Sequence, residues 1–147
     1  MEKEQKNSIT ADVLGALGRD KVKNPRLLNP LVLAYVGDTV YDLFVRSYLV
    51  SSSDAGVHSL HLRAAKKVCA AAQAAAFRRI ENMLTEDELT IYKRGRNSHM
   101  GSVPKHASIV DYRTATGLET LVGFLYLCGD DERLELLMGA ALCEEEI

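Results

Sequence analysis

Two acidic residues lie inside segments that are otherwise apolar. Asp38 follows Gly37 in the stretch LAYVGDTVYDLFVR, residues 33–46, and Glu119 lies in ATGLETLVGFLYL, residues 115–127. An ionised carboxylate beside a protein core is unfavourable unless it is paired or binds a metal. Carboxylate oxygens from facing helices can hold a hard cation such as Mg²⁺, which keeps water molecules that can become the nucleophile of a hydrolysis.

The spacing leaves a second interpretation open. Asp38 could pair with a basic residue, and Glu119 could cap a helix or form a salt bridge at the surface. A helix would place Ala34, Asp38 and Asp42 on one face. Asp42 is therefore a candidate outer partner of a metal site.

Glycines accompany both carboxylates. Gly37 costs a helix about 1 kcal/mol relative to alanine, and Gly117 and Gly123 flank Glu119. These glycines predict close packing of one helix backbone against another, or a ligand.

A basic segment precedes the second carboxylate. YKRGRNSHMGSVPKH, residues 92–106, is rich in Gly, Ser and basic residues and reads as a long loop. Such loops are often functional, and this one suits contacts with phosphates. Its candidate nucleic-acid-binding residues are Lys93, Arg94, Arg96, Asn97 and Lys105. His99 and His106 are candidate general bases, although loop histidines are more often bystanders.

Charge is spread unevenly along the chain. The net charge is -2, but residues 58–113 carry +5, residues 114–147 carry -7 and residues 1–57 are balanced. A basic middle on an acidic protein indicates a local site for a polyanion. Plain solvated helix faces explain the charge pattern equally well.

The elements that must position these residues are helices. Apolar spacing and abundant Ala and Leu predict helices over residues 8–18, 30–49, 59–80, 86–94, 109–128 and 131–142, with no β-type alternation. Asn29 before Pro30 predicts a capped helix start, and Thr85 with Glu88 predicts a capping box. We expect one all-α domain over residues 1–147, with residues 1–10 as a flexible tail.

Composition indicates the cellular compartment of the protein. The three cysteines are Cys69, Cys128 and Cys143, which share no metal-type spacing and read as buried thiols in a reducing cytosol. The N-terminus has no signal-peptide pattern, and no apolar run is long enough to span a membrane. We expect a cytoplasmic protein.

Three blocks together resemble Mini-ribonuclease III, the small bacterial branch of the ribonuclease III family. They are LAYVGDTVYDLFVR, YKRGRNSHMGSVPKHA and YRTATGLETLVGFLYL. YVGD is similar to the family's FLGD signature, and GLETLVGFLYL is similar to its FEALIGALYL block. The similarity covers residues 29–137, and two such blocks in order around a basic loop are quite specific.

The resemblance implies an all-helical ribonuclease III endonuclease-domain-like bundle that works as a homodimer. It implies Mg²⁺-dependent hydrolysis of double-stranded RNA that leaves 5′-phosphate and 3′-hydroxyl ends. The implied substrate is precursor 23S ribosomal RNA, trimmed at its paired ends, and a large-subunit ribosomal protein is a possible partner. Asp38 and Glu119 are implied as catalytic metal ligands.

Two positions depart from the larger family. Ala34 stands where the family has a further Glu, and Thr116 stands where it has an Asp. This reduction puts a two-metal site in doubt and favours one Mg²⁺ held by Asp38 and Glu119, with waters completing its coordination. Thr116, like Asp42, is then a possible outer-shell residue.

The chain is also expected to lack a double-stranded-RNA-binding domain. The catalytic domain must then contact RNA itself, which adds Lys66, Lys67, Arg78 and Arg79 as candidate phosphate contacts. Recognition should depend on duplex shape, phosphates and 2′-hydroxyls. By analogy with the family the dimer face is the helix of Asp38, with Val36, Val40 and Phe44 as contributors.

Two other functions compete with this hypothesis. One is a non-catalytic RNA-binding module of the same fold, which the missing carboxylates at positions 34 and 116 favour. The other is a helical metal-dependent hydrolase of nucleotides, which would need further ligands at helical spacing, such as Glu-x-x-His, that the sequence lacks.

Overall fold

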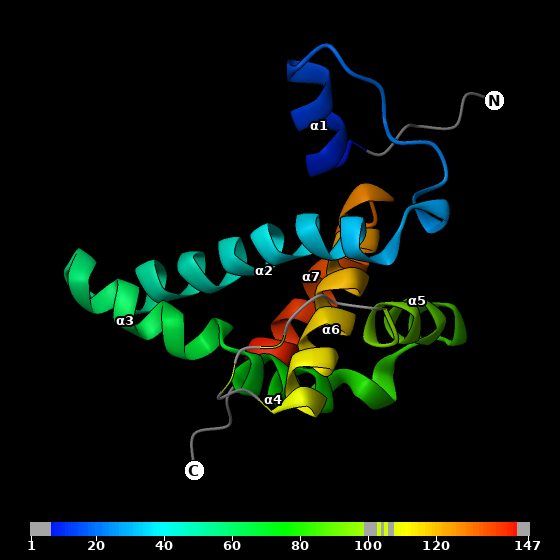
Figure 1. The fold of residues 1–147 in the computed structure, drawn as a ribbon. Helices are drawn as coiled ribbons and strands as arrows, with labels where there is room; N and C mark the ends of the chain where they lie inside the picture. Colours follow the sequence, from blue (N-terminus) through cyan, green and yellow to red (C-terminus); the bar gives the residue numbers. More distant parts are fainter. Residues whose placement is uncertain (1–6, 99–102, 104, 106–107, 144–147) are drawn as a thin grey trace.

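The computed structural model describes residues 7–98, 103, 105 and 108–143, and these residues form helices with no strand among them. Figure 1 shows the arrangement, which confirms the all-α prediction. The helices are α1 (Ile9–Ala16), α2 (Pro30–Ser52), α3 (Val57–Val68), α4 (Ala70–Ile80), α5 (Glu86–Arg96), α6 (Ile109–Leu127) and α7 (Asp131–Leu142), with short 3-10 helices at Pro25–Leu27 and Glu81–Met83.

Helix α6 is the central element. Twelve of its residues are buried, and α2, α4 and α5 all pack against it (Figure 1). Its buried residues include Leu118, Leu121 and Val122, which join Leu33 and Tyr41 of α2 in the core. A helix buried on most of its sides must offer small residues where its neighbours come closest, and α6 does so at its glycines.

Helices α2 and α6 cross in backbone contact. A Cβ added to Gly37 would lie 1.7 Å from the backbone oxygen of Glu119, and one added to Gly123 would lie 1.9 Å from that of Leu33. No side chain can occupy either position without moving a backbone. The sequence-based expectation that these glycines allow a close approach is confirmed.

Local signals set several helix ends as predicted. Asn29 accepts a hydrogen bond from the backbone N–H of Leu31 at the start of α2. Thr85 and Glu88 form the reciprocal capping box of α5. Each cap pairs N–H groups that the helix itself leaves unpaired.

The long helix expected over residues 59–80 is wrong. Cys69 is extended (φ -66°, ψ 158°) and separates α3 from α4. The break lets α3 pack along α2 while α4 turns beneath α6 (Figure 1). No glycine or proline marks it, because it arises from these two different packing partners.

Two smaller expectations have different outcomes. Helix α5 ends at Arg96, near Gly95 as predicted, and Gly95 itself is buried where a Cβ would lie 2.1 Å from the hydroxyl oxygen of Thr120. The three cysteines are free and exposed, not buried. Residues 1–6 of the expected tail lie outside the described residues.

Candidate active site

The crossing of α2 and α6 brings the two carboxylates together. Asp38 directly follows Gly37, and the Glu119 backbone is the group that Gly37 contacts. Asp38 is exposed, while Glu119 is partly buried. The two acidic side chains therefore lie where α2 and α6 come closest. The Asp38 side chain is open to solvent, and the Glu119 side chain is partly buried.

The two carboxyl groups interact strongly. The pKa of Glu119 is raised from its ordinary value of 4.5 to about 8, first by burial, then by a hydrogen bond with Asp38 and by the negative charge of Asp38. A carboxylate pair that shares one proton at neutral pH is the expected state of two acids held close together. The same arrangement favours a cation, which would replace the proton and neutralise both charges.

The donor set fits Mg²⁺ better than metals that need a full protein cage. Mg²⁺ is commonly bound through one or two carboxylates and keeps several waters. No group of three or more His, Cys, Asp or Glu residues able to hold a metal occurs among the residues that the structure describes. A two-carboxylate site with solvent on the Asp38 side meets the requirement for retained waters.

The two possible outer-shell residues have other partners. Asp42 forms an ion pair with Arg46, at 2.8 Å from Oδ2 to Nε. Thr116 is buried, and its hydroxyl donates a hydrogen bond of 3.0 Å to the Tyr112 carbonyl one turn earlier in α6. Their roles near a metal stay predictions.

Tyr41 is a residue near Glu119 that its sequence context did not single out. It lies one turn after Asp38, only 1% of its surface is exposed, and its buried hydroxyl has no hydrogen-bond partner among the described residues. Burial raises its pKa to about 12, while Arg79 lowers it and Glu119 raises it. A tyrosine on the apolar face of the Asp38 helix was the available signal, because a buried hydroxyl needs a partner.

The basic residues of the predicted loop divide between a helix and the following segment. Lys93, Arg94 and Arg96 form the last turn of α5, which Asn97 ends. Arg94 Nη1 donates to the Arg26 carbonyl at 2.7 Å, and the Arg96 guanidinium lies 5.7 Å from the centre of the Tyr92 ring. Lys105 is exposed. The cations near a helix C-terminus interact favourably with its dipole, so a structural role accompanies any role in binding.

His99 and His106 lie outside the described residues. The residues directly before and directly after Lys105 also lie outside the described part of the chain, although Val103 is described. The general-base hypothesis for these histidines stays untested.

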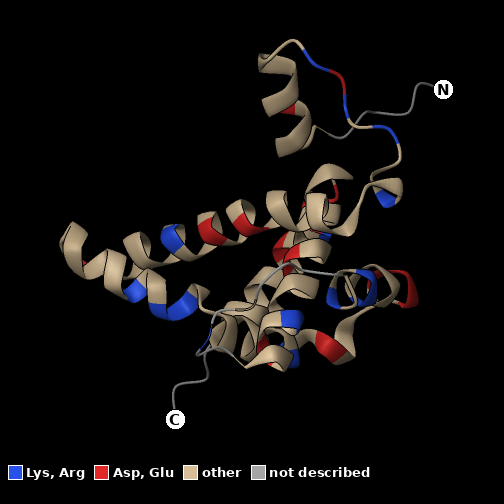
Figure 2. Cartoon of the chain, in the orientation of Figure 1, with Lys and Arg blue, Asp and Glu red and all other residues tan. Residues whose placement is uncertain are grey.

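The second basic group lies at the ends of α3 and α4. Lys66 and Lys67 are in the last turn of α3, and Arg78 and Arg79 are in the last turn of α4. Figure 2 shows basic positions on α3 and around the ends of α4 and α5, while α2 carries both acidic and basic positions. Lys66, Lys67, Arg79 and Tyr41 line one small cavity.

Comparison with known proteins identifies this arrangement. Residues 31–130 match the Ribonuclease III domain, a range that includes both carboxylates and most of the basic residues. The chain belongs to the ribonuclease III family. Within that family it is 47% identical over 124 residues to Mini-ribonuclease 3 of Clostridium tetani, covering 83% of this chain and 82% of the relative. It is 45% identical over 112 residues to Mini-ribonuclease 3 of Brevibacillus brevis, covering 76% of this chain and 84% of the relative.

A solved structure has the same fold. A crystal structure of a protein from Fusobacterium nucleatum matches with a TM-score of 0.72 at 28% identity, covering 80% of this chain and 94% of that chain. The resemblance to Mini-ribonuclease III and the helical-bundle architecture are therefore confirmed. Asp38 and Glu119 lie within the matched range, as do Ala34 and Thr116.

One long face of α2 in this ribonuclease III domain is apolar and exposed. Val32, Tyr35, Leu43 and Val50 are exposed by 47%, 79%, 60% and 66%, and all lie on one stripe of the helix. Val40, expected to contribute to a dimer surface, is instead buried in the protomer core. Val36 and Phe44 are partly buried against that core.

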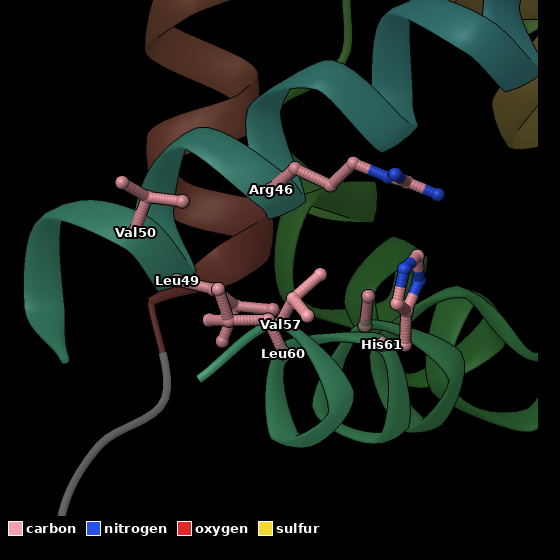
Figure 3. Close-up of a pocket in the computed structure, with 7 residues that line it drawn as sticks. Arg46, Leu49, Val50, Val57, Leu60 and His61 are labelled. Carbon is pink, nitrogen blue, oxygen red and sulfur yellow. The ribbon is translucent and has the colours of Figure 1, made fainter. Parts of the chain in front are cut away.

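A pocket of about 140 Å³ continues this stripe between α2 and α3. Figure 3 shows Leu49 of α2 close to Val57 and Leu60 of α3, while Val50 lies on another side of α2. Arg46 and His61 are the polar residues that line the pocket. It contains no carboxylate and lies away from the Asp38–Glu119 pair. We therefore assign it to the apolar surface and not to the chemistry.

Proposed function

We propose that this protein is an Mg²⁺-dependent endoribonuclease that cuts double-stranded RNA during maturation of precursor 23S ribosomal RNA. Membership of the ribonuclease III family supports the class of reaction. The observation that carries the metal assignment is the coupling of Asp38 and Glu119 across the α2–α6 contact. Two acids held at this separation favour a divalent cation between them.

The chain's own residues divide the work between binding the metal and admitting substrate. Asp38 and Glu119 would hold Mg²⁺, which when bound lowers the pKa of water and neutralises charge on a phosphoryl group. Glu119 must release its proton before it can act as a ligand. Because Asp38 is exposed, a phosphodiester can reach the pair from solvent. Cleavage would leave 5′-phosphate and 3′-hydroxyl ends.

The basic residues would hold the duplex backbone. Lys93, Arg94, Arg96, Asn97 and Lys105 form one group of proposed RNA contacts, and Lys66, Lys67 and Arg78 form the other. A-form RNA has a major groove too narrow for side chains, so contacts to phosphates and 2′-hydroxyls should dominate. Each phosphate contact adds to the salt dependence of binding.

Cleavage of both strands would need two sites, and the exposed stripe of α2 supports a homodimer. Tyr35 and Leu43 are large apolar residues in open solvent, and a second copy of the chain would cover them. A contribution from a large-subunit ribosomal protein and a cytoplasmic location stay predictions. No helix in the described part of the chain is long and apolar enough to cross a membrane.

The decisive experiment incubates the protein with a long RNA duplex in Mg²⁺ or in EDTA. We expect cleavage in Mg²⁺ only, and none by Asp38→Asn. Asp54→Asn, which removes an exposed acid in the loop after α2, is the matched control and should cleave as wild type does. Cleavage of a precursor 23S transcript at its paired ends would test the substrate.

A non-catalytic RNA-binding module is the second candidate. The absence of a third ligand among the described residues favours it. Duplex binding without cleavage by folded wild-type protein in Mg²⁺ would establish this alternative. Full cleavage by folded Asp38→Asn would instead refute the metal assignment.

A further inference from the structure

A small polar cavity that Tyr41 of α2 helps to line has no assigned role. Its volume is about 80 Å³, enough for several water molecules. The residues that line it are Tyr41, Lys66, Lys67, Ala72, Ala75, Arg79 and Leu142. None of these described residues is acidic, and three of them, Lys66, Lys67 and Arg79, are basic.

Tyr41 gives the cavity an unused hydrogen-bond donor. It is the only lining residue from α2, so its ring extends from that helix toward the ends of α3 and α4. Its hydroxyl is buried and has no partner among the described residues. A buried hydroxyl that stays unpaired is unfavourable, which indicates that a group absent from the structure accepts this hydrogen bond.

The start of α4 adds a second donor group. The first N–H groups of a helix have no partner within it, and the N-cap residue Cys69 makes no side-chain cap here. Ala72, in this first turn, lines the cavity. The break at Cys69 therefore creates a helix N-terminus, which attracts anions, beside Lys66 and Lys67.

Two of the cations are held in place by the fold. Arg79 Nε donates to the Ala141 carbonyl at 2.8 Å, which fixes the guanidinium at the cavity. Lys67 Nζ lies 5.3 Å from the centre of the Tyr48 ring. A preorganised set of donors loses little entropy when it binds an anion.

We propose that this cavity binds a phosphate group of the RNA backbone, next to the phosphate that is cut. Tyr41 follows Asp38 by three residues on α2, a rise of about 4.5 Å along the helix, and this short spacing is the basis for placing the second phosphate beside the first. This inference rests on the proposed nuclease function, because it names a substrate contact of the same site.

The first test measures binding of inorganic phosphate to the full chain in EDTA by calorimetry. We expect Tyr41→Phe and Lys66→Gln each to weaken binding about tenfold, the effect of losing one hydrogen bond to a charged group. Arg63→Gln removes the same charge one turn before Lys67, outside the cavity, and should bind phosphate as wild type does. Equal phosphate affinity in wild type and Tyr41→Phe would overturn the proposal.

Thermal unfolding separates a ligand role from a structural one. Phenylalanine keeps the ring and removes only the unpaired hydroxyl, so Tyr41→Phe should melt at the same or a higher temperature in phosphate-free buffer. Added phosphate should raise the melting temperature of wild type more than that of Tyr41→Phe. A lower melting temperature for Tyr41→Phe without phosphate would mean that the hydroxyl serves the fold, which overturns the proposal.

The second test distinguishes RNA from free phosphate. Binding of an RNA duplex in EDTA, where no cleavage occurs, should weaken about tenfold in Tyr41→Phe, and Lys66→Gln should reduce the salt slope by about one phosphate contact. Loss of phosphate binding with unchanged duplex binding would assign the cavity to a free phosphate and overturn the RNA contact. Neither measurement needs cleavage, so failure of the nuclease proposal would appear separately, as duplex binding without Mg²⁺-dependent products.

Discussion

The carboxylate pair should make the metal-free protein unstable at alkaline pH, and Glu119→Gln should relieve this. Burial and the neighbouring Asp38 raise the pKa of Glu119 to about 8 in the folded protein, whereas the unfolded chain has the ordinary value of 4.5. The folded state therefore binds more protons between these pH values. Since stability falls with pH wherever the folded state holds the extra proton, wild type should lose stability from about pH 5 to pH 8.

The size of the effect follows from the same values. Each pH unit between the two pKa values is worth about 1.4 kcal/mol, so the full interval sets a ceiling of about 5 kcal/mol. Asp38 is exposed and Glu119 only partly buried, so solvent screens part of this energy. At each pH the free energy of unfolding of Glu119→Gln is compared with that of wild type. We expect the variant's advantage to be larger at pH 8 than at pH 5 by about 2–3 kcal/mol.

Urea unfolding in EDTA at pH 5 and pH 8 measures this difference. Glu135→Gln, an exposed change on α7, is the charge-matched control and should follow wild type at both pH values. Added Mg²⁺ should restore the stability of wild type at pH 8, because it binds only the folded state. The same addition should leave Glu119→Gln nearly unchanged.

Two results would refute this reasoning. A difference between Glu119→Gln and wild type that stays constant from pH 5 to pH 8 would mean that neither burial nor Asp38 raises the pKa of Glu119 in the folded protein. Glu119→Gln that is less stable than wild type at pH 8 would mean that the ionised carboxylate is stabilised in the fold, by a partner other than a metal.

Three further perturbations follow from the packing. Gly37→Ala would place a Cβ 1.7 Å from a backbone oxygen of α6 and should lower the free energy of unfolding, measured by urea titration, by more than about 3 kcal/mol. The control is Gly139→Ala, whose Cβ would have nothing within 4 Å. In the same titration it should be neutral or stabilising by up to about 1 kcal/mol. Arg133→Ala removes the bidentate partner of buried Glu88 and should lower the free energy of unfolding by about 3 kcal/mol at pH 7. The ion pair lowers the pKa of Glu88 below its ordinary value of 4.5. The difference in melting temperature between wild type and Arg133→Ala should therefore shrink as the pH falls below that value. Leu43→Asp on the exposed stripe of α2 should shift the molecular mass measured by light scattering from dimer to monomer without lowering helix content, and an unchanged mass would exclude that stripe as the interface.

The sequence predicted most helices because their signals are local. Asn29 with Pro30, and Thr85 with Glu88, set helix starts through hydrogen bonds between near neighbours. Helix α7 runs from Asp131 to Leu142 as predicted, because the turn residues that set its start lie directly before it in the sequence. These ends depend little on the rest of the fold.

The main failure has a tertiary cause. Cys69 interrupts a strongly helical sequence because α3 and α4 pack on different partners. Gly95 lies in the last turn of α5, where a helix stop was predicted, and it also makes room for Thr120 of α6. A glycine placed for close packing and a glycine placed for a turn look alike until the neighbouring helix is known.

The candidate site was predictable in part for the same reason. Asp38 and Glu119 are conspicuous in sequence because each is a charge in an apolar segment. Tyr41 was not conspicuous, because a tyrosine on a buried helix face is usually a core residue. Only the unpaired hydroxyl beside a basic cavity distinguishes it, and both are properties of the assembled fold.

The number of carboxylates in this domain also bears on how many metals the proposed site would hold. Two ionised acids carry a charge that one divalent cation balances, whereas four would leave an excess that favours a second cation. Ala34 and Thr116 remove that excess. Without a second cation near the substrate phosphates, the remaining negative charge of the RNA must be met by the protein. Lys66, Lys67 and Arg79, which line the cavity beside Tyr41, are among the cations that we propose for this role.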